Sequence, residues 1–174
     1  GTGEYIARPG FGVAPEFDAD FACHFGLSKP VIAAINGPAA GVGLVLAAFA
    51  DLRFAVAGAK FTAAHGRFNF PAEFRLSWLL PRIVGLTHAN DILLSSRIFT
   101  AEEAREMGFL NAVLPAGSLM PHVMAYARGL AEGVSPGSLK AVKRQIYTDL
   151  HRDAASAVTA AARLLEAMIH HPDY

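Results

Sequence analysis

The sequence feature that most constrains the fold is an apolar run, a glycine-bearing turn and a second apolar run between residues 30 and 51. Residues 31–35 (Val-Ile-Ala-Ala-Ile) follow a proline and are typical of a buried strand. Asn36-Gly37-Pro38 indicates a turn, and residues 44–50 are apolar enough to form a core helix. A strand, a turn and a buried helix in this order direct backbone N–H groups and the positive end of the helix dipole toward the turn.

Such a turn can bind a phosphate, a carboxylate or a developing oxyanion. The alternative is a tight strand-to-helix connection in which Gly41 and Gly43 only permit close packing. A nucleotide site is disfavoured, because Gly37, Gly41 and Gly43 do not follow the GxGxxG spacing and no GKS or GKT motif follows them. From the residues alone, anion binding and close packing both stay open.

The composition narrows the classes of partner. The chain has 174 residues, enough for one domain with a sizeable core, and 53% of them are hydrophobic whereas 17% are charged. This balance predicts apolar surface that meets another subunit or a lipid-like ligand. The formal net charge is zero and no basic block occurs, so nucleic acid is not an expected partner. No apolar run of about eighteen residues occurs, so neither a membrane-spanning helix nor a membrane partner is expected.

Cysteine and histidine usage predicts neither a disulfide nor a metal site. Cys23 is the single cysteine, which fits a reducing compartment, either the cytoplasm or the interior of an organelle. His170-His171 lacks a third ligand nearby, so we interpret it as a helix end. The chain starts at Gly1 rather than at a methionine, so targeting information can lie upstream.

The rest of the pattern predicts short strands in the first half and helices in the second. Two helix starts carry clear signals: Thr100 to Glu103 is a capping box, and Ser135-Pro136 is an N-cap followed by proline at the first helical position. Strands are expected over 31–35, 51–56, 60–62 and 112–114. Helices are expected over 17–26, 44–50, 73–85, 88–95, 101–108, 118–132, 136–150 and 153–170, with an irregular segment over 63–72.

Six short motifs follow one another along the chain: Lys29 to Gly37, Gly41-Val42-Gly43, Ala50-Asp51, Lys60-Phe61, Leu80 to Gly85, and Thr100 to Ala104 followed by Gly108. In order and spacing they resemble the crotonase superfamily, the enoyl-CoA hydratase/isomerase family. The resemblance implies one α/β domain over 1–174, with a crotonase-like ββα spiral core over 29–115. It also implies a lead-in over 1–28 and a C-terminal helical trimerisation region over 116–174, without the family's N-terminal strands and C-terminal tail.

The resemblance implies an enzyme of fatty acid metabolism that binds an acyl-CoA thioester, with coenzyme A as part of the substrate and no separate cofactor. Such enzymes hold the thioester carbonyl with two backbone N–H groups while an enolate forms. By position, one donor here is the amide of Val42, with Ala40 and Gly41 beside it. The second donor of the family lies in an Ala-Asp-(Ile/Leu) motif, which residues 1–28 do not contain.

The reaction is less constrained than the family. Hydratases of this family carry two glutamates, and the matching positions here are Val45 and His65. Val45 cannot move a proton, whereas His65 could, since histidine changes charge near neutral pH; the alternative is a loop histidine bonded to its neighbours. These replacements leave three hypotheses open: an enoyl-CoA isomerase, a hydratase that adds water, or a non-catalytic acyl-CoA-binding homologue.

Glu73 is the carboxylate that the resemblance favours as general base. The segment 71–82 is similar to the peroxisomal type of 3-enoyl to 2-enoyl-CoA isomerase, in which a glutamate moves a proton between two carbons of the acyl chain. The alternatives are pairing with Arg75 and a plain acidic residue in the first turn of a helix. We expect burial to make the carboxylate a better base, against Phe68, Phe70, Phe74 and Trp78. Substrate contacts are expected from Ala40, Gly41, His65 and Trp78.

The last two predicted helices carry a basic group and an apolar stripe. The basic residues Lys140, Lys143 and Arg144 could face the phosphates of coenzyme A or bulk solvent. The stripe predicts packing against a neighbouring subunit, and the resemblance implies a homotrimer or a dimer of trimers. The stripe consists of Ala154, Ala157, Ala161, Leu164, Leu165 and Met168.

Overall fold

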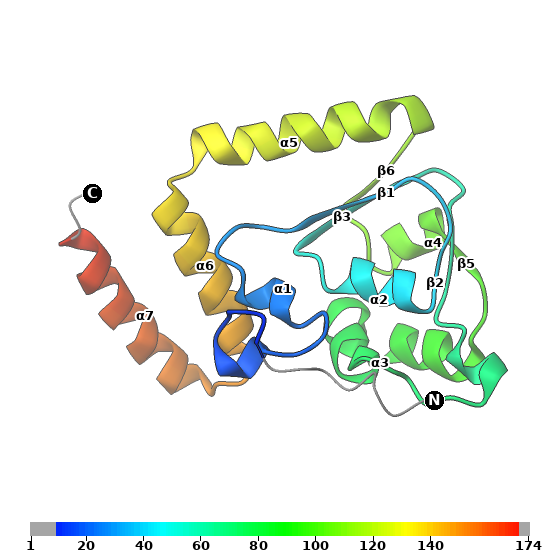
Figure 1. Ribbon diagram of the computed structural model, residues 1–174, viewed down its shortest axis with the longest axis horizontal. Helices are drawn as coiled ribbons and strands as arrows, with labels where there is room; N and C mark the ends of the chain where they lie inside the picture. Colours follow the sequence, from blue (N-terminus) through cyan, green and yellow to red (C-terminus); the bar gives the residue numbers. More distant parts are fainter. Residues whose placement is uncertain (1–9, 171–174) are drawn as a thin grey trace.

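A computed structural model describes residues 10–170 and arranges them as two small sheets surrounded by helices (Figure 1). The predictions that concern residues 1–9 and His171 therefore lie outside the described residues. The first sheet is parallel and has the order β1-β3-β6, formed by β1 (Ile32–Ile35), β3 (Leu52–Val56) and β6 (Ala112–Leu114). In the second sheet, β4 (Lys60–Thr62) pairs parallel with β2 (Ala39–Ala40) and antiparallel with β5 (Phe99–Thr100).

Strand alternation sends side chains of the first sheet to two separate cores. Phe54 of β3 is buried against α5 (Leu119–Gly133), which lies along one face of the sheet (Figure 1). Ala55, the next residue, belongs to the larger core on the other face, where α2 (Val42–Ala48) packs. Because side chains alternate with a period of two along a strand, a one-residue slip of β3 would exchange these faces. The register of β3 therefore decides which of its side chains face α5 and which face α2.

The remaining helices follow the sequence prediction closely in the second half. The capping box is confirmed: Thr100 Oγ1 accepts the Glu103 N–H at 3.3 Å, and the Glu103 carboxylate accepts the Thr100 N–H at 2.8 Å. Gly85, with φ of 75°, interrupts the third helix where the sequence predicts a break. These helices are α1 (Cys23–Gly26), α3 (Leu76–Ser95), α4 (Ala101–Glu106), α6 (Pro136–Asp149) and α7 (Ala154–Ile169), with 3-10 turns η1 (Pro15–Phe17), η2 (His65–Phe68) and η3 (Ala116–Ser118).

Two predicted helix starts are wrong, both because of residues with positive φ. The helix expected over 17–26 shortens to α1, since Phe21 adopts φ of 61°. The helix expected to begin at Glu73 begins at Leu76, since Phe74 and Arg75 adopt φ of 50° and 61°. This left-handed region is unfavourable for bulky residues, so tertiary packing rather than local preference imposes it.

A buried polar cluster of Asp51, Lys143 and Tyr147, called here the Asp51 cluster, fastens α6 to the core. Lys143 Nζ donates to Asp51 Oδ2 at 2.7 Å and to the carbonyl oxygens of His24 and Lys29 at 2.8 and 2.9 Å. The Tyr147 hydroxyl donates to Asp51 Oδ1 at 2.6 Å. Burial is the main cause that raises the pKa of Tyr147 well above its ordinary value, and the bond to Asp51 is the second, so the phenol stays a hydrogen-bond donor. Lys143 faces neither coenzyme A nor solvent, which corrects that interpretation.

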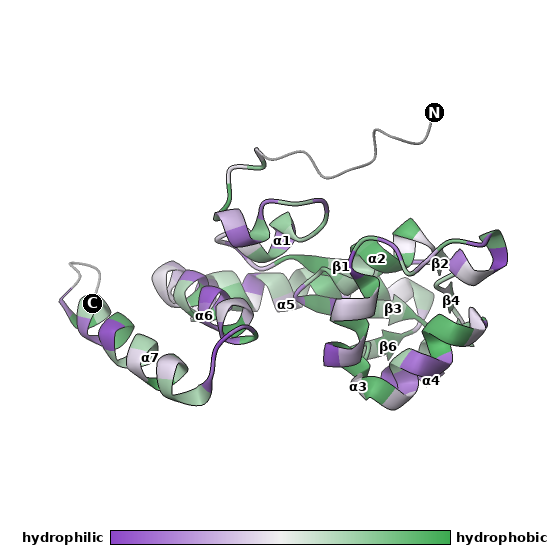
Figure 2. Cartoon of the chain, turned by 90° about the horizontal axis from the view of Figure 1, so that it is seen from below, coloured by the Kyte–Doolittle hydropathy of each residue, from purple (hydrophilic) through white to green (hydrophobic). Residues whose placement is uncertain are grey.

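The last helix, α7, has no buried residue within the described chain. It extends away from the two sheets, next to α6 (Figures 1 and 2). Apolar side chains nevertheless lie on it, among them Val158, Leu165 and Ile169, which are exposed. Part of the apolar surface of α7 faces α6, and the exposed apolar side chains leave area available for another surface.

Candidate functional site

The turn between β2 and α2 contains Ala40, Gly41 and Val42. Gly41 adopts φ of 51° and ψ of −118°, a conformation that residues with a Cβ rarely reach. Its N–H donates to the Thr62 carbonyl at 3.1 Å, and its own carbonyl accepts the Val45 N–H at 3.1 Å as the first bond of α2. The Val42 amide precedes that bond and therefore has no acceptor within the helix. The turn thus presents a backbone donor at the positive end of α2, which is the geometry that the sequence predicts.

The segment with His65 lies next to this turn. Ala40 pairs with Thr62 across the second sheet, and His65 follows three residues later in η2. The His65 N–H donates to Ala63 O at 2.8 Å, and its carbonyl accepts the Phe70 N–H at 3.1 Å. The side chain is partly buried. The structure therefore brings Ala40, Gly41, Val42 and the His65 segment together.

Val45 occupies the position of the first hydratase glutamate and is 3% exposed. It packs in the larger core together with Leu44 and Ala48 of the same helix. An apolar side chain here continues the buried face of α2 and offers no group that could move a proton. Any proton carrier of this site must come from another segment.

Glu73 lies in the segment between η2 and α3, and its side chain is exposed. The expected burial is wrong, since Phe68 and Phe70 are themselves 66% and 55% exposed. Phe74 turns into the core instead and packs edge-to-face on Phe21 at 5.0 Å between ring centroids. Within residues 10–170, no ion pair joins Glu73 to Arg75.

Trp78 lies in a different environment, at an aromatic cavity of about 170 Å³. Its ring stacks on the His151 ring with 5.3 Å between the ring centroids, and the Arg82 guanidinium lies 4.2 Å from the Trp78 ring centroid. Arg75, two residues after Glu73, also lines this cavity. The other lining residues come from η1, α1, the end of α2, and α6: Glu16, Phe17, Ala22, Phe25, Phe49 and Tyr147, with His151 after α6.

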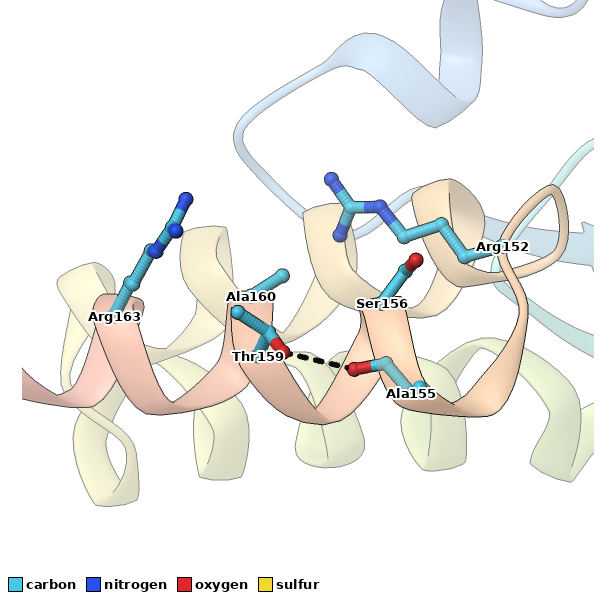
Figure 3. A pocket seen from close by; sticks show the side chains of 6 residues that line it. All are labelled: Arg152, Ala155, Ser156, Thr159, Ala160 and Arg163. Atoms are coloured by element: carbon cyan, nitrogen blue, oxygen red, sulfur yellow. Dashed lines mark hydrogen bonds between the residues drawn. The ribbon is translucent and has the colours of Figure 1, made fainter.

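A second hollow, of about 420 Å³, lies along α7 and contains none of the predicted site residues. Arg152, Ser156 and Arg163 point to the same side of the helix, while Thr159 Oγ1 donates to the Ala155 carbonyl at 3.0 Å (Figure 3). Across residues 10–170, no three His, Cys, Asp or Glu side chains are grouped so as to hold a metal ion. The helices of this same part of the chain are too short or too polar to cross a bilayer.

The chain belongs to the enoyl-CoA hydratase/isomerase family, whose model matches residues 13–174. It is 42% identical over 131 residues to the probable enoyl-CoA hydratase EchA12 of Mycobacterium tuberculosis, and the aligned region covers 75% of this chain and 45% of that protein. It is 37% identical over 105 residues to the 1,2-epoxyphenylacetyl-CoA isomerase of Escherichia coli, and this aligned region covers 60% of this chain and 40% of that protein. The chain thus spans about half the length of the curated relatives that it matches.

The fold prediction is confirmed by comparison with solved structures. A probable enoyl-CoA hydratase/isomerase from Mycobacterium abscessus superposes with a TM-score of 0.82 at 32% identity, covering 86% of this chain and 61% of that one. The crotonase-like α/β fold expected from the motifs is therefore the fold of this chain. Sequence reasoning missed Thr62, whose carbonyl accepts the Gly41 N–H of the β2–α2 turn, because this bond depends on strand pairing that no local motif encodes.

Proposed function

We propose that the protein acts on an acyl-CoA thioester and moves the double bond of an enoyl-CoA. One observation carries the proposal: the Val42 amide is presented at the Gly41 turn, while an apolar residue fills the first hydratase position, Val45. A reaction that needs an oxyanion donor but no activated water fits this combination better than hydration does. The relative from Escherichia coli is named as an isomerase of an epoxyphenylacetyl-CoA, which supports an acyl-CoA thioester as the substrate class.

Each residue then has a defined task. The Val42 N–H binds the thioester oxygen, and the Glu73 carboxylate removes a proton from the carbon next to the carbonyl. The electron pair left behind moves onto the oxygen and forms an enolate, which the amide and the dipole of α2 stabilise. The protonated Glu73 returns the proton to the far carbon of the double bond, and the carbonyl re-forms. Ala40, Gly41 and His65 border the thioester, and the aromatic side chains at the Trp78 cavity offer apolar surface to the acyl chain.

The Glu73→Gln variant is expected to lose about 100- to 10,000-fold in kcat with little change in KM, since the amide keeps the shape of the side chain but cannot accept the proton. The conversion of 3-enoyl-CoA to the conjugated thioester, followed by absorbance, measures this. Glu106→Gln on α4, an exposed glutamate elsewhere, is the matched control and keeps wild-type turnover. Turnover that survives in Glu73→Gln would eliminate Glu73 as the base.

Hydration is the second candidate, because the Mycobacterium tuberculosis relative is named as a hydratase. In that case His65, at the position of the second hydratase glutamate, activates the water. Water addition to 2-enoyl-CoA that is lost in His65→Gln and retained in Glu73→Gln would favour this candidate. Saturable binding of acyl-CoA without either reaction would identify a non-catalytic homologue.

We also propose that α7 packs against further copies of the chain in a homotrimer or a dimer of trimers. Leu165→Asp is expected to dissociate the oligomer, since it places a charge on the exposed apolar stripe of α7. Thr159→Asp adds the same charge off that stripe and is the matched control. Analytical ultracentrifugation measures the mass, and a wild-type protein that sediments as a single chain contradicts the proposal.

A further inference from the structure

Thr62 bonds to both halves of the candidate site, the Gly41 turn and the segment with His65. Its carbonyl accepts the Gly41 N–H at 3.1 Å and so holds the turn that orients the Val42 amide. Its hydroxyl accepts the Ala64 N–H at 3.1 Å, immediately before His65. The same hydroxyl donates to the Ser96 carbonyl at 3.0 Å. All these groups therefore depend on the orientation of a single residue at the end of β4.

Ser96 supplies the fixed point for this arrangement. It is 1% exposed and caps the C-terminal end of α3, where its N–H donates to Ile92 O at 3.1 Å. Its hydroxyl accepts the Gly66 N–H at 3.0 Å. A Cβ at Gly66 would approach Ser96 Oγ to 2.6 Å, so the segment has no room to shift toward α3. The His65 segment is thus anchored on both sides of His65 to a buried helix end.

We propose that Thr62 is a positioning residue that couples the Val42 oxyanion turn to the His65 segment. The proposal rests on the proposed function only in taking the Val42 amide as the oxyanion donor. The Thr62 hydroxyl, held by Ser96 and Ala64, fixes the peptide that follows Thr62. The carbonyl of that same peptide holds Gly41. A rotation of this peptide would therefore release both segments together.

A pair of substitutions separates the hydroxyl from the shape of the side chain. Thr62→Val keeps the β-branched shape that suits a strand but removes both hydroxyl bonds, whereas Thr62→Ser keeps the hydroxyl. Ser95→Ala is the matched control: Ser95 is exposed, and its hydroxyl bonds to Asp91 O and the Arg97 N–H, outside the site. Amide hydrogen exchange in the folded protein, resolved by NMR, reports each backbone N–H without any need for turnover.

In Thr62→Val we expect exchange to accelerate about tenfold at Ala64, whose N–H loses the Thr62 hydroxyl as acceptor, because one lost hydrogen bond corresponds to roughly this factor. Gly66 and Gly41 keep their acceptors, the Ser96 hydroxyl and the Thr62 carbonyl, so faster exchange there is expected only through the coupling. Thr62→Ser should restore wild-type rates at all three amides, and Ser95→Ala should leave them unchanged. Acceleration at Ala64 and Gly66 with an unchanged Gly41 would overturn the coupling.

Kinetics provide the second readout. We expect kcat of Thr62→Val to fall about tenfold with KM unchanged, and a bound conjugated acyl-CoA to lose part of the red shift that a polarised carbonyl causes. Rescue by Thr62→Ser is expected in both measurements. A wild-type protein without turnover or red shift would refute the proposed function, while the exchange pattern would still decide the coupling. Wild-type kcat and red shift in an active Thr62→Val enzyme would overturn the positioning role.

Discussion

The Gly41→Ala variant is expected to lose about 100- to 1,000-fold in kcat and about 1–3 kcal/mol in the free energy of unfolding. Gly41 has φ of 51° and ψ of −118°, which an alanine can adopt only with strain. No heavy atom lies within 4 Å of the position that a Cβ would take, so the effect is conformational rather than steric. If the backbone relaxes to a negative φ, the Val42 amide turns away from the thioester oxygen. Urea unfolding and turnover of 3-enoyl-CoA measure the two effects.

Gly43→Ala is the matched control for this prediction. Its Cβ would lie 3.7 Å from the Ala39 Cβ, an ordinary contact, and Gly43 already lies within α2. Alanine is favoured over glycine in a helix by roughly 1 kcal/mol, so the free energy of unfolding should be unchanged or slightly higher. A Gly41→Ala protein with wild-type kcat would mean that the direction of the Val42 amide does not depend on this glycine, and that the proposed donor is wrong.

The parts of the fold that the sequence predicts are those with a local signal. The apolar run of β1, the Asn36-Gly37-Pro38 turn and the apolar run of α2 each indicate one element. Together they place Val42 in the turn that leads into a helix, and in the structure that helix begins at Val42 itself. The Thr100 capping box is equally local, since both of its bonds join residues three apart. Strand order and register were beyond such signals, because they depend on residues distant in the chain.

The surroundings of Glu73 show where sequence reasoning stops. The aromatic residues around it suggested burial, but which of them turn inward is decided by packing. Phe74 packs on Phe21, and Phe74, Arg75 and Phe21 all adopt positive φ against their own preference. The environment of Lys143 was misjudged for a similar reason: its three oxygen partners come from segments 92 to 119 residues away.

The Lys143→Met variant is expected to lose about 3–5 kcal/mol in the free energy of unfolding, measured by urea denaturation. Lys143 is 5% exposed, and its ammonium group donates to Asp51 and to the carbonyl oxygens of His24 and Lys29. Methionine matches the length of the side chain but leaves these acceptors without their donor, and a buried carboxylate without its cation. A cost of this size follows from the charge that is left behind rather than from the pair itself.

Two comparisons test that reason. Asp51→Asn combined with Lys143→Met removes both charges, so the double variant should be more stable than the sum of the single losses implies. Arg152→Ala breaks the ion pair with Asp149, where both side chains are about one-third exposed, and should cost less than about 1 kcal/mol. Equal losses in Lys143→Met and Arg152→Ala would contradict the burial argument. The Asp51 cluster joins α6 to α1, to the residues before β1 and to the start of β3. A large loss of unfolding free energy in Lys143→Met alone would therefore establish that this cluster fastens α6 to the α/β core.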